Sequence, residues 1–267
     1  MPDASIAARS GSFSVAVTGS GGSGAVTTGL ILLEAAAHAG YFGMLSRSTG
    51  PQIRGGESAA MLRLGPAPLD CMDDRFDLLV GLDWLNIARF IDEIPLDRDS
   101  LVLADPAAGA VPAVLTQSGA RVREVPFKEL ASSAADGRAN MVALGALAAA
   151  GGFPQDALLA GLNAVLAGKG ERVRQASSQC LTLGYQQGIE TLPRAAGAAR
   201  HPVARWNISG NEACGLGALR GGIRFVAAYP ITPASEIHEW LAPRLEQVGG
   251  SLLQAEDELA TNKKING

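Results

Sequence analysis

The sequence is poor in aromatic residues and carries no excess of positive charge. Aromatic side chains make up only 5% of the 267 residues, whereas alanine and glycine are plentiful. This composition disfavours a large aromatic β-sandwich and favours an α/β core of tightly packed small side chains. The formal net charge of −4 provides no overall basic field, so we expect no nucleic-acid partner.

Long apolar runs are missing as well. No run reaches the length that a helix needs to cross a bilayer. The start of the chain, residues 1–12, contains one arginine and no apolar segment typical of a secretory signal. We therefore expect no membrane partner and a cytoplasmic location.

Cysteines are few and widely separated. Cys71, Cys180 and Cys214 form no Cys-x-x-Cys pair, and the three histidines share no metal-ligand spacing. We therefore expect no zinc or iron–sulfur site within this chain and predict that each cysteine is a buried apolar residue. Any one-electron chemistry would then need another polypeptide.

Strand and helix patterns alternate through the first half of the chain. This alternation predicts an α/β fold with a Rossmann-like, doubly wound and mostly parallel sheet. Strands are predicted at 13–18, 41–45, 59–64, 76–82, 101–104 and 122–127, and helices at 25–39, 140–150 and 155–167.

The pattern divides the chain into four segments. We expect an N-terminal extension at 1–12, a first domain at 13–190, a linker at 191–208 and the start of a second α/β domain at 209–267. That last segment is too short to close an ordinary core, and its polar end, 261–267, extends no apolar helix face. We expect a truncated second domain.

A glycine-rich loop, Gly19-Ser20-Gly21-Gly22-Ser23-Gly24, lies between the first strand and the first helix. Gly19, Gly21, Gly22 and Gly24 permit positive φ and close approach of backbone N–H groups, and the helix N-terminus adds partial positive charge. Read from Gly19, the loop fits G-x-G-x-x-G and predicts a phosphate site. A tight turn without a ligand is the alternative.

Arginines rather than carboxylates follow the second predicted strand. A dinucleotide site needs an acidic residue there to hold a ribose, but the chain reads Ser46-Arg47-Ser48. NAD is therefore disfavoured, and Arg47 suits the phosphate of NADP or coenzyme A. Arg54, in a second glycine-rich loop at 50–58, could bind a phosphate or carboxylate or be a solvated surface residue.

The segment Tyr229-Pro-Ile-Thr-Pro233 follows an apolar strand candidate at 225–228. Pro230 and Pro233 fix their own φ and keep the residues before them out of the α region, so the turn is stiff. We expect it to hold the Thr232 hydroxyl at the carboxyl end of a strand, where open α/β sheets bind ligands.

Three acidic residues, Glu256, Asp257 and Glu258, follow the next strand candidate, 251–255. If that strand continued, Glu256 and Glu258 would face one side. A buried carboxylate there would have a raised pKa and could share a proton with a ligand nitrogen. The alternative, an acidic first turn of a helix, is favoured by the spacing and by the helix dipole.

Together these motifs resemble the 2-oxoacid:ferredoxin (acceptor) oxidoreductases of the 2-oxoglutarate type. Residues 17–64, with the glycine-rich loop and Arg54-Gly55-Gly56-Glu57-Ser58, resemble the gamma-type domain, as does the helix segment 140–145. Gly210-Asn211-Glu212-Ala213 and Tyr229-Pro-Ile-Thr-Pro233 resemble the start of the thiamine-diphosphate pyrimidine domain of an alpha subunit.

The resemblance implies oxidative decarboxylation of a 2-oxoacid with coenzyme A to an acyl-CoA. Thiamine diphosphate would be the electron sink, with Glu258 matching the glutamate at the aminopyrimidine N1′ and Thr232 a threonine near the thiazolium. The gamma-type domain would help to bind coenzyme A. A beta subunit would carry the diphosphate and magnesium site and an iron–sulfur cluster, and ferredoxin would accept the electrons.

Two other functions remain open from the sequence. The chain could be a non-catalytic module that binds coenzyme A or a nucleotide, or an assembly subunit that keeps only an interface for its partner. In the enzyme interpretation we expect the chain alone to be inactive.

Overall fold

The computed structural model describes residues 11–50, 55–192 and 206–266. Arg54 therefore lies outside the described residues. The same holds for most of the predicted N-terminal extension, 1–12, and most of the predicted linker, 191–208. The chain divides into two compact units, unit 1 (Met1–Arg205) and unit 2 (Trp206–Gly267). Each unit is described by itself.

Unit 1 is built on a six-stranded sheet with the order β2-β3-β1-β4-β5-β6. Strands β1, β4, β5 and β6 run parallel, whereas β3 is antiparallel to both β1 and β2. The strands are β1 (Phe13–Ser20), β2 (Phe42–Thr49), β3 (Glu57–Gly65), β4 (Leu78–Gly81), β5 (Leu101–Ala104) and β6 (Arg121–Glu124). Three of the five pairings are thus parallel, which confirms the predicted α/β fold with a mostly parallel sheet.

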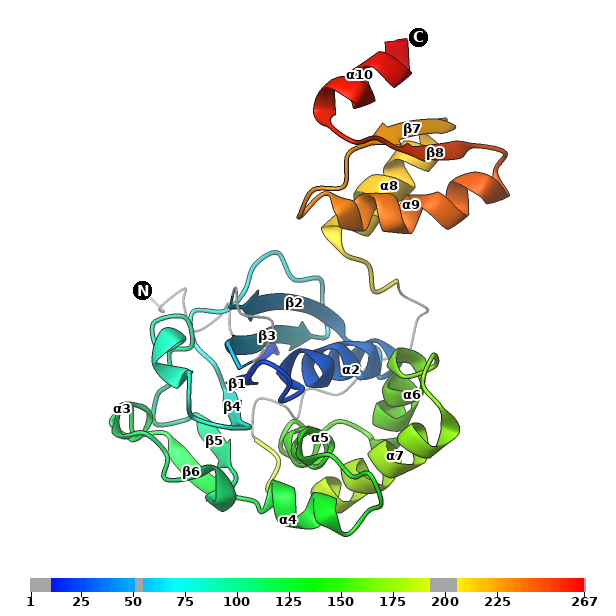
Figure 1. The fold of residues 1–267 in the computed structure, drawn as a ribbon. Coiled ribbons are helices and arrows are strands. Elements are labelled where there is room, and N and C mark those ends of the chain that lie inside the picture. Colours follow the sequence, from blue (N-terminus) through cyan, green and yellow to red (C-terminus); the bar gives the residue numbers. More distant parts are fainter. Residues whose placement is uncertain (1–10, 51–54, 193–205, 267) are drawn as a thin grey trace. The chain divides into compact units, whose positions relative to one another are not determined.

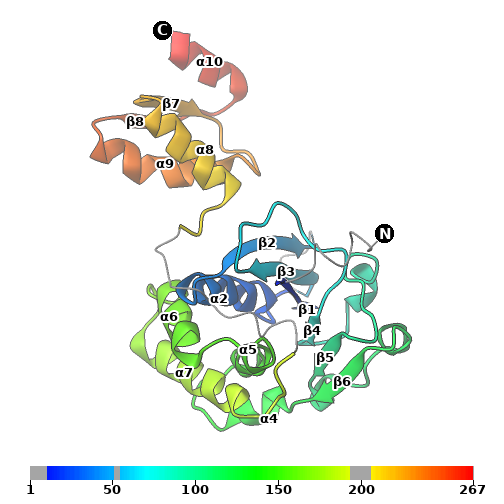
Figure 2. The same cartoon turned by 180° about the vertical axis from the view of Figure 1, so that it is seen from behind.

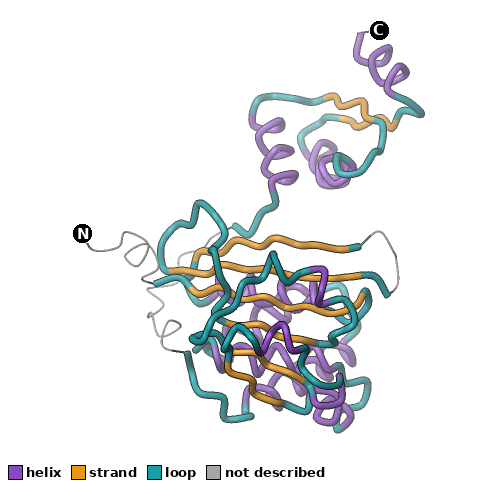
Figure 3. Tube along the Cα trace, turned by 90° about the vertical axis from the view of Figure 1, so that its left-hand side faces the viewer, coloured by secondary structure: helices purple, strands orange, loops and turns teal. Residues whose placement is uncertain are grey.

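One face of this sheet carries the long helices (Figure 1). Figure 2 shows the same grouping from behind, and Figure 3 shows the strands side by side with helices against one face. The helices of unit 1 are α2 (Ala25–His38), α3 (Ala113–Thr116), α4 (Phe127–Ser132), α5 (Ala139–Ala150), α6 (Gln155–Val165) and α7 (Glu171–Tyr185).

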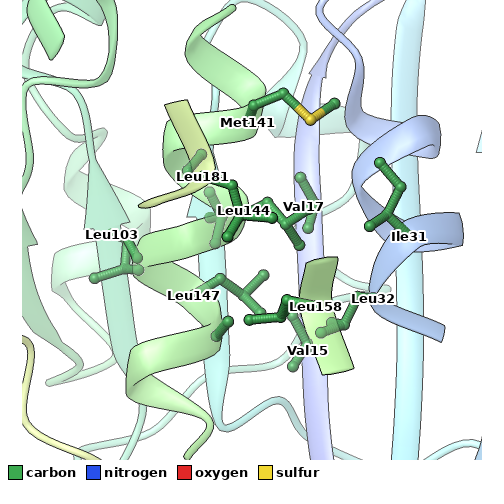
Figure 4. Close-up of a cluster of buried hydrophobic side chains, with 14 of the residues drawn as sticks. Val15, Val17, Ile31, Leu32, Leu103, Met141, Leu144, Leu147, Leu158 and Leu181 are labelled. Carbon is green, nitrogen blue, oxygen red and sulfur yellow. The ribbon is translucent and has the colours of Figure 1, made fainter. Parts of the chain in front are cut away.

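The main core lies between the sheet and α2, α5, α6 and α7. Val15 and Val17 of β1 are fully buried and contribute to the same cluster as Leu144 of α5 and Ile31 of α2. Figure 4 shows these side chains converging between the strand and the helices. Burying an aliphatic side chain of this size contributes about 1.5–3 kcal/mol, so this cluster fixes the helices against the strand that leads into the glycine-rich loop.

The opposite face of the sheet has a thinner cover than the helical face. Its smaller cluster, which includes Phe76, Ile87 and Phe90, is covered by irregular chain, the 3₁₀ turn η1 (Ile87–Arg89) and the short helix α3. A second 3₁₀ turn, η2 (Pro106–Ala108), follows β5. The connections from β4 to β5 and from β5 to β6 contain only 3₁₀ turns and one four-residue helix. Long helices therefore cover one face of the sheet alone.

Several predicted boundaries also change. Strand β2 continues through Thr49, so Ser46-Arg47-Ser48 lies inside it and not after it. Strand β6 ends at Glu124, and Phe127 begins α4 with its ring buried. Proline at 126 cannot donate to the ladder, which explains why the strand stops earlier than its apolar pattern indicates.

Unit 2 contains helix, strand, helix and strand in the predicted order, followed by a third helix. Its elements are α8 (Gly210–Arg220), β7 (Phe225–Ala228), α9 (Ser235–Gln247), β8 (Ser251–Gln254) and α10 (Glu258–Asn266). The two strands pair in parallel, with Phe225 opposite Ser251 and Ala228 opposite Gln254. The polar segment from Thr261 to Asn266 continues α10.

The cysteines follow the prediction only in part. Cys180 is buried on α7, and burial raises the pKa of its thiol. Cys71 and Cys214 are exposed, so the prediction of three buried cysteines is wrong for two of them. In the described part of the chain, no helix combines the length and apolar character needed to cross a membrane.

Candidate functional site

The glycine-rich loop lies between β1 and α2, as the sequence predicts. Gly19 is still within β1, where it is buried and pairs with Ser58 of β3. Gly22 and Gly24 have φ of 95° and 92°, values that side chains other than glycine rarely adopt. Gly24 is also the N-cap of α2, which has no side-chain cap hydrogen bond. The helix therefore begins with N–H groups that have no intrahelical acceptor.

The two glycine-rich loops meet, although 25 residues of sequence, 25–49, separate them. Antiparallel β3 starts beside the end of β1, with Glu57 opposite Ser20. As a result the Gly21 N–H donates to the Gly56 carbonyl at 2.7 Å, and the Gly55 N–H donates to the Gly21 carbonyl at 3.4 Å. The described part of the second loop is thus a direct neighbour of the first.

A carboxylate that the sequence analysis missed holds the start of the glycine-rich loop. Asp83 lies two residues after the end of β4, the strand next to β1. Its carboxylate accepts from the Ser20 N–H at 2.8 Å, the Ser20 hydroxyl at 2.9 Å and the Leu85 N–H at 3.2 Å. A signal was present, because an acidic residue after a strand beside β1 must lie at the same sheet edge.

Asn86 extends this network to the second loop. Its side-chain amide donates to the Ser20 hydroxyl at 3.4 Å and to the Gly55 carbonyl at 3.3 Å. The Asp83–Asn86 segment therefore connects both glycine-rich loops through Ser20.

Replacing Asp83 with alanine should destabilise unit 1. The Ser20 N–H, the Ser20 hydroxyl and the Leu85 N–H would lose their acceptor, and we expect the free energy of unfolding to fall by about 1–3 kcal/mol. Urea titration would measure the change. The exposed Asp92 offers a control, because Asp92→Ala should stay within about 0.5 kcal/mol of wild type. Equal stability of the two variants would contradict the role of Asp83.

The other side of the loop faces the beginning of α5. Asn140 is 5% exposed, and its amide nitrogen lies 3.4 Å from both the Gly24 carbonyl and the Thr28 hydroxyl. A Cβ at position 24 would collide with this amide, so glycine is required there for space as well as for φ. Gly22, Ser23 and Gly24 also line a cavity of about 540 Å³ on this side.

Arg47, one of the two predicted arginines, has no described contact with this loop. Arg47 is exposed in the edge strand β2, pairs with Ala60 of β3 and is not among the residues that line the cavity. Its predicted place after a strand is wrong because β2 is longer than its apolar pattern. Arg54 lies outside the described residues.

In unit 2, hydrogen bonds connect the Gly210-Asn211 segment to the Tyr229-Pro-Ile-Thr-Pro233 turn and the helix after it. The Asn211 side-chain amide on α8 donates to the Pro233 carbonyl at 3.4 Å and to Glu236 Oε2 at 2.9 Å. A capping box between Ser209 and Glu212 fixes the start of α8. Asn211 therefore anchors the turn that carries Thr232 to both neighbouring helices.

Thr232 and Glu258 lie beyond the same edge of the small sheet. Thr232 follows β7 and Glu258 follows β8, and the carboxyl ends of adjacent parallel strands meet at one edge. Both side chains are exposed. Glu258 is the first residue of α10, so the buried-carboxylate interpretation is wrong for this chain by itself, and the acidic first turn is what the structure has.

The three acidic residues differ in their hydrogen bonds. The Asp257 carboxylate accepts from the Ala260 N–H at 2.6 Å and so caps α10. Glu256 and Glu258 make no side-chain hydrogen bond with any described residue. Their carboxylates are therefore available to a ligand, whereas that of Asp257 is already used.

Comparison with known proteins decides the family. The family model described as "Pyruvate ferredoxin/flavodoxin oxidoreductase" matches residues 14–187, which is most of the chain. The chain belongs to this family. A second model of the same oxidoreductases, described as their thiamine-diphosphate-binding part, matches residues 216–267. Each match falls within one of the two compact units.

Individual relatives of this oxidoreductase chain agree. It is 47% identical over 60 residues to the 2-oxoglutarate synthase subunit KorA of Methanocaldococcus jannaschii, covering 22% of this chain and 16% of that protein. Identity to the KorC subunit of Methanothermobacter thermautotrophicus is 30% over 148 residues, covering 52% of this chain and 76% of that protein.

A solved structure resembles nearly the whole oxidoreductase chain. It is the 2-oxoglutarate:ferredoxin oxidoreductase from Magnetococcus marinus with 2-oxoglutarate, coenzyme A and succinyl-CoA bound. The TM-score is 0.85 at 28% identity, over 96% of this chain and 45% of that one. The chain thus spans less than half of the solved relative and a sixth of the KorA relative.

Proposed function

We propose that the chain acts as a subunit of a 2-oxoacid:ferredoxin oxidoreductase, which converts a 2-oxoacid such as 2-oxoglutarate and coenzyme A to an acyl-CoA. The observation that carries the proposal is the match of both family models in one chain, one of them thiamine-diphosphate-binding. That second match makes a non-catalytic module or an assembly subunit the less favoured alternative.

The residues of unit 2 are suited to the aminopyrimidine end of thiamine diphosphate. Glu258 offers a carboxylate without a hydrogen-bond partner among the described residues, at the sheet edge that also carries Thr232. In the proposal, Glu258 holds a proton between its carboxyl group and the ring nitrogen N1′, and Thr232 orients the substrate. When bound, the coenzyme supplies the electron sink for decarboxylation.

A partner must complete the proposed site. Glu258 and Thr232 are both exposed in this chain, whereas a shared proton is held best where water is excluded. We propose that a beta subunit covers this edge, supplies the diphosphate and magnesium site, and carries the iron–sulfur cluster that passes electrons to ferredoxin. Coenzyme A would contact the glycine-rich loop of unit 1.

Reconstitution tests the proposal. The purified chain alone should show no 2-oxoglutarate-dependent reduction of ferredoxin. Co-expression with the beta subunit of a 2-oxoglutarate oxidoreductase should give a rate that needs 2-oxoglutarate, coenzyme A and thiamine diphosphate together. Thiamine-dependent oxidation by the chain alone would contradict the need for a partner. A stable complex that is inactive under all these conditions would favour the assembly alternative.

A further inference from the structure

The turn that carries Thr232, residues 229–233, has few hydrogen bonds of its own. Ile231, Thr232 and Pro233 are exposed, and the two prolines of the turn have no N–H to donate. The Ser235 N–H, at the start of α9, donates to the Ile231 carbonyl at 3.0 Å. That bond joins the turn only to the helix that directly follows it, so it does not fix where the turn lies in unit 2.

One side chain supplies a fixed point for this turn. Among the described residues, only Asn211 forms a hydrogen bond between the turn and a segment distant from it in sequence. Its amide donates to the Pro233 carbonyl, one residue after Thr232, at 3.4 Å and to Glu236 Oε2 on α9 at 2.9 Å. The bond to the carboxylate is charge-assisted and therefore the stronger of the two. Glu236 thus holds the amide while the amide holds the turn.

The place of Asn211 is itself fixed at two points along α8. The capping box between Ser209 and Glu212 sets the start of the helix. One turn later, Gly215 packs so closely on α9 that a Cβ there would lie 2.7 Å from the Trp240 ring. Residues 211 and 215 are four positions apart and share one face of the helix, so Asn211 faces α9.

The residue type at position 211 follows from the two groups that it contacts. The Pro233 carbonyl and the Glu236 carboxylate are both acceptors, and the asparagine amide provides two N–H donors on one nitrogen. An aspartate of the same shape would provide only acceptors and would place a second negative charge beside Glu236. The two contacts therefore require a neutral donor.

We propose that Asn211 is a positioning residue, whose amide holds the turn so that the Thr232 hydroxyl stands where the 2-oxoacid is bound. The inference rests on the role of Thr232 in the proposed function and extends that role to a residue on another helix. In this arrangement Asn211 does not touch the substrate and acts only through Thr232.

Hydrogen exchange in the full chain tests the hold on the turn without any measurement of activity. Asn211→Ala removes both donors, and because alanine is the best helix former, α8 should be preserved. We expect the Ser235 N–H to exchange about 10-fold faster in this variant, since the turn opens more often once its hydrogen bond is lost. Exchange at Ser235 that equals the wild-type rate would overturn the inference.

Asn163→Ala is the matched control. Asn163 is exposed on α6 of unit 1 and forms no hydrogen bond with any described residue. The same chemical change there should leave both the exchange at Ser235 and the kinetics of the complex within about twofold of wild type.

A double-mutant cycle in the complex reconstituted with the beta subunit tests whether Asn211 acts through Thr232. Thr232→Ala and Asn211→Ala should each lower kcat/KM for 2-oxoglutarate about 10-fold, through a higher KM, because each loses one hydrogen bond. The KM for coenzyme A should not change. In a complex that already carries Thr232→Ala, Asn211→Ala should lower kcat/KM by less than a further twofold or so.

The outcomes separate this inference from the proposed function. A second full 10-fold loss in the double variant would overturn the inference and leave the proposed function standing. A lower kcat in Asn211→Ala with both KM values unchanged would indicate loss of folded protein alone and would also overturn it. A Thr232→Ala complex as active as wild type would instead overturn the role of Thr232 in the proposed function, and exchange at Ser235 would still decide whether Asn211 holds the turn.

Discussion

Gly184→Ala should lower the free energy of unfolding of unit 1 by about 2 kcal/mol or more. A Cβ at this position of α7 would collide with the backbone carbonyl of Val142 on α5. Gly145 of α5 has the reciprocal contact with the Leu181 carbonyl, so the two helices pack backbone against backbone. The added methyl group would force them apart, and overpacking of this kind outweighs the gain of about 1 kcal/mol from helix propensity.

A glycine in an open position provides the matched control for this prediction. Gly217 also lies inside a helix, α8, but a Cβ there would meet no atom within 4 Å. Gly217→Ala should therefore stabilise unit 2 by about 0.5–1 kcal/mol. Chemical denaturation followed by circular dichroism measures both variants. If Gly184→Ala stabilised the protein as well, the close approach of α5 and α7 would be wrong.

Helix α7 also shows why the sequence predicted only part of the fold. Its buried positions are Ala176, Ser177, Cys180, Leu181 and Gly184, and most of these are small or polar. A periodicity search for large apolar residues therefore misses this helix, although its packing is among the closest in unit 1. Strands β1 and β5, by contrast, bury nearly every residue, and their apolar runs predicted them well.

Strand β2, at the edge of the sheet, was predicted too short because its last residues are exposed and polar. In β2 the residues from Ser46 to Thr49 are polar and largely exposed, so an apolar pattern ends at Leu45 while the hydrogen-bonded ladder continues to Thr49. This difference changes the interpretation of Arg47. The rule that ligand-binding residues follow the carboxyl ends of strands correctly predicted where the glycine-rich loop and Thr232 lie. Those positions depend only on the order of strands and helices along the chain.

The residues that line the cavity beside the glycine-rich loop could be identified only from the tertiary structure. Arg138, Lys169 and Ser177 come from three different helices or their ends, and no spacing in the sequence relates them to the glycine-rich loop. Asp83 could have been predicted from the strand order alone, without the packing of the helices. Because β1 and β4 are neighbours in the sheet, a residue after β4 lies beside the loop. Local pattern therefore identifies the loop, and the packing of α5, α6 and α7 determines which side of it is open.

Glu258→Gln should abolish most of the activity of the reconstituted complex. Glutamine keeps the size and the hydrogen-bonding oxygen of the side chain, but it cannot hold a proton in exchange with a ring nitrogen. General acid–base catalysis contributes about 10²- to 10⁴-fold, and we expect a fall in kcat of that size. Because the variant leaves Thr232 and the glycine-rich loop intact, the KM for 2-oxoglutarate and for coenzyme A should change little.

The neighbouring acidic residue separates this role from simple charge. Glu256 is exposed and without a described hydrogen-bond partner, like Glu258, but it precedes the first residue of α10 by two positions. Glu256→Gln removes the same charge from the same segment, so the two variants differ only in where the carboxylate stands. A complex that lost activity equally in both would show that the acidic cluster acts through its overall charge. A complex that lost activity only in Glu256→Gln would move the proton-holding role to that residue.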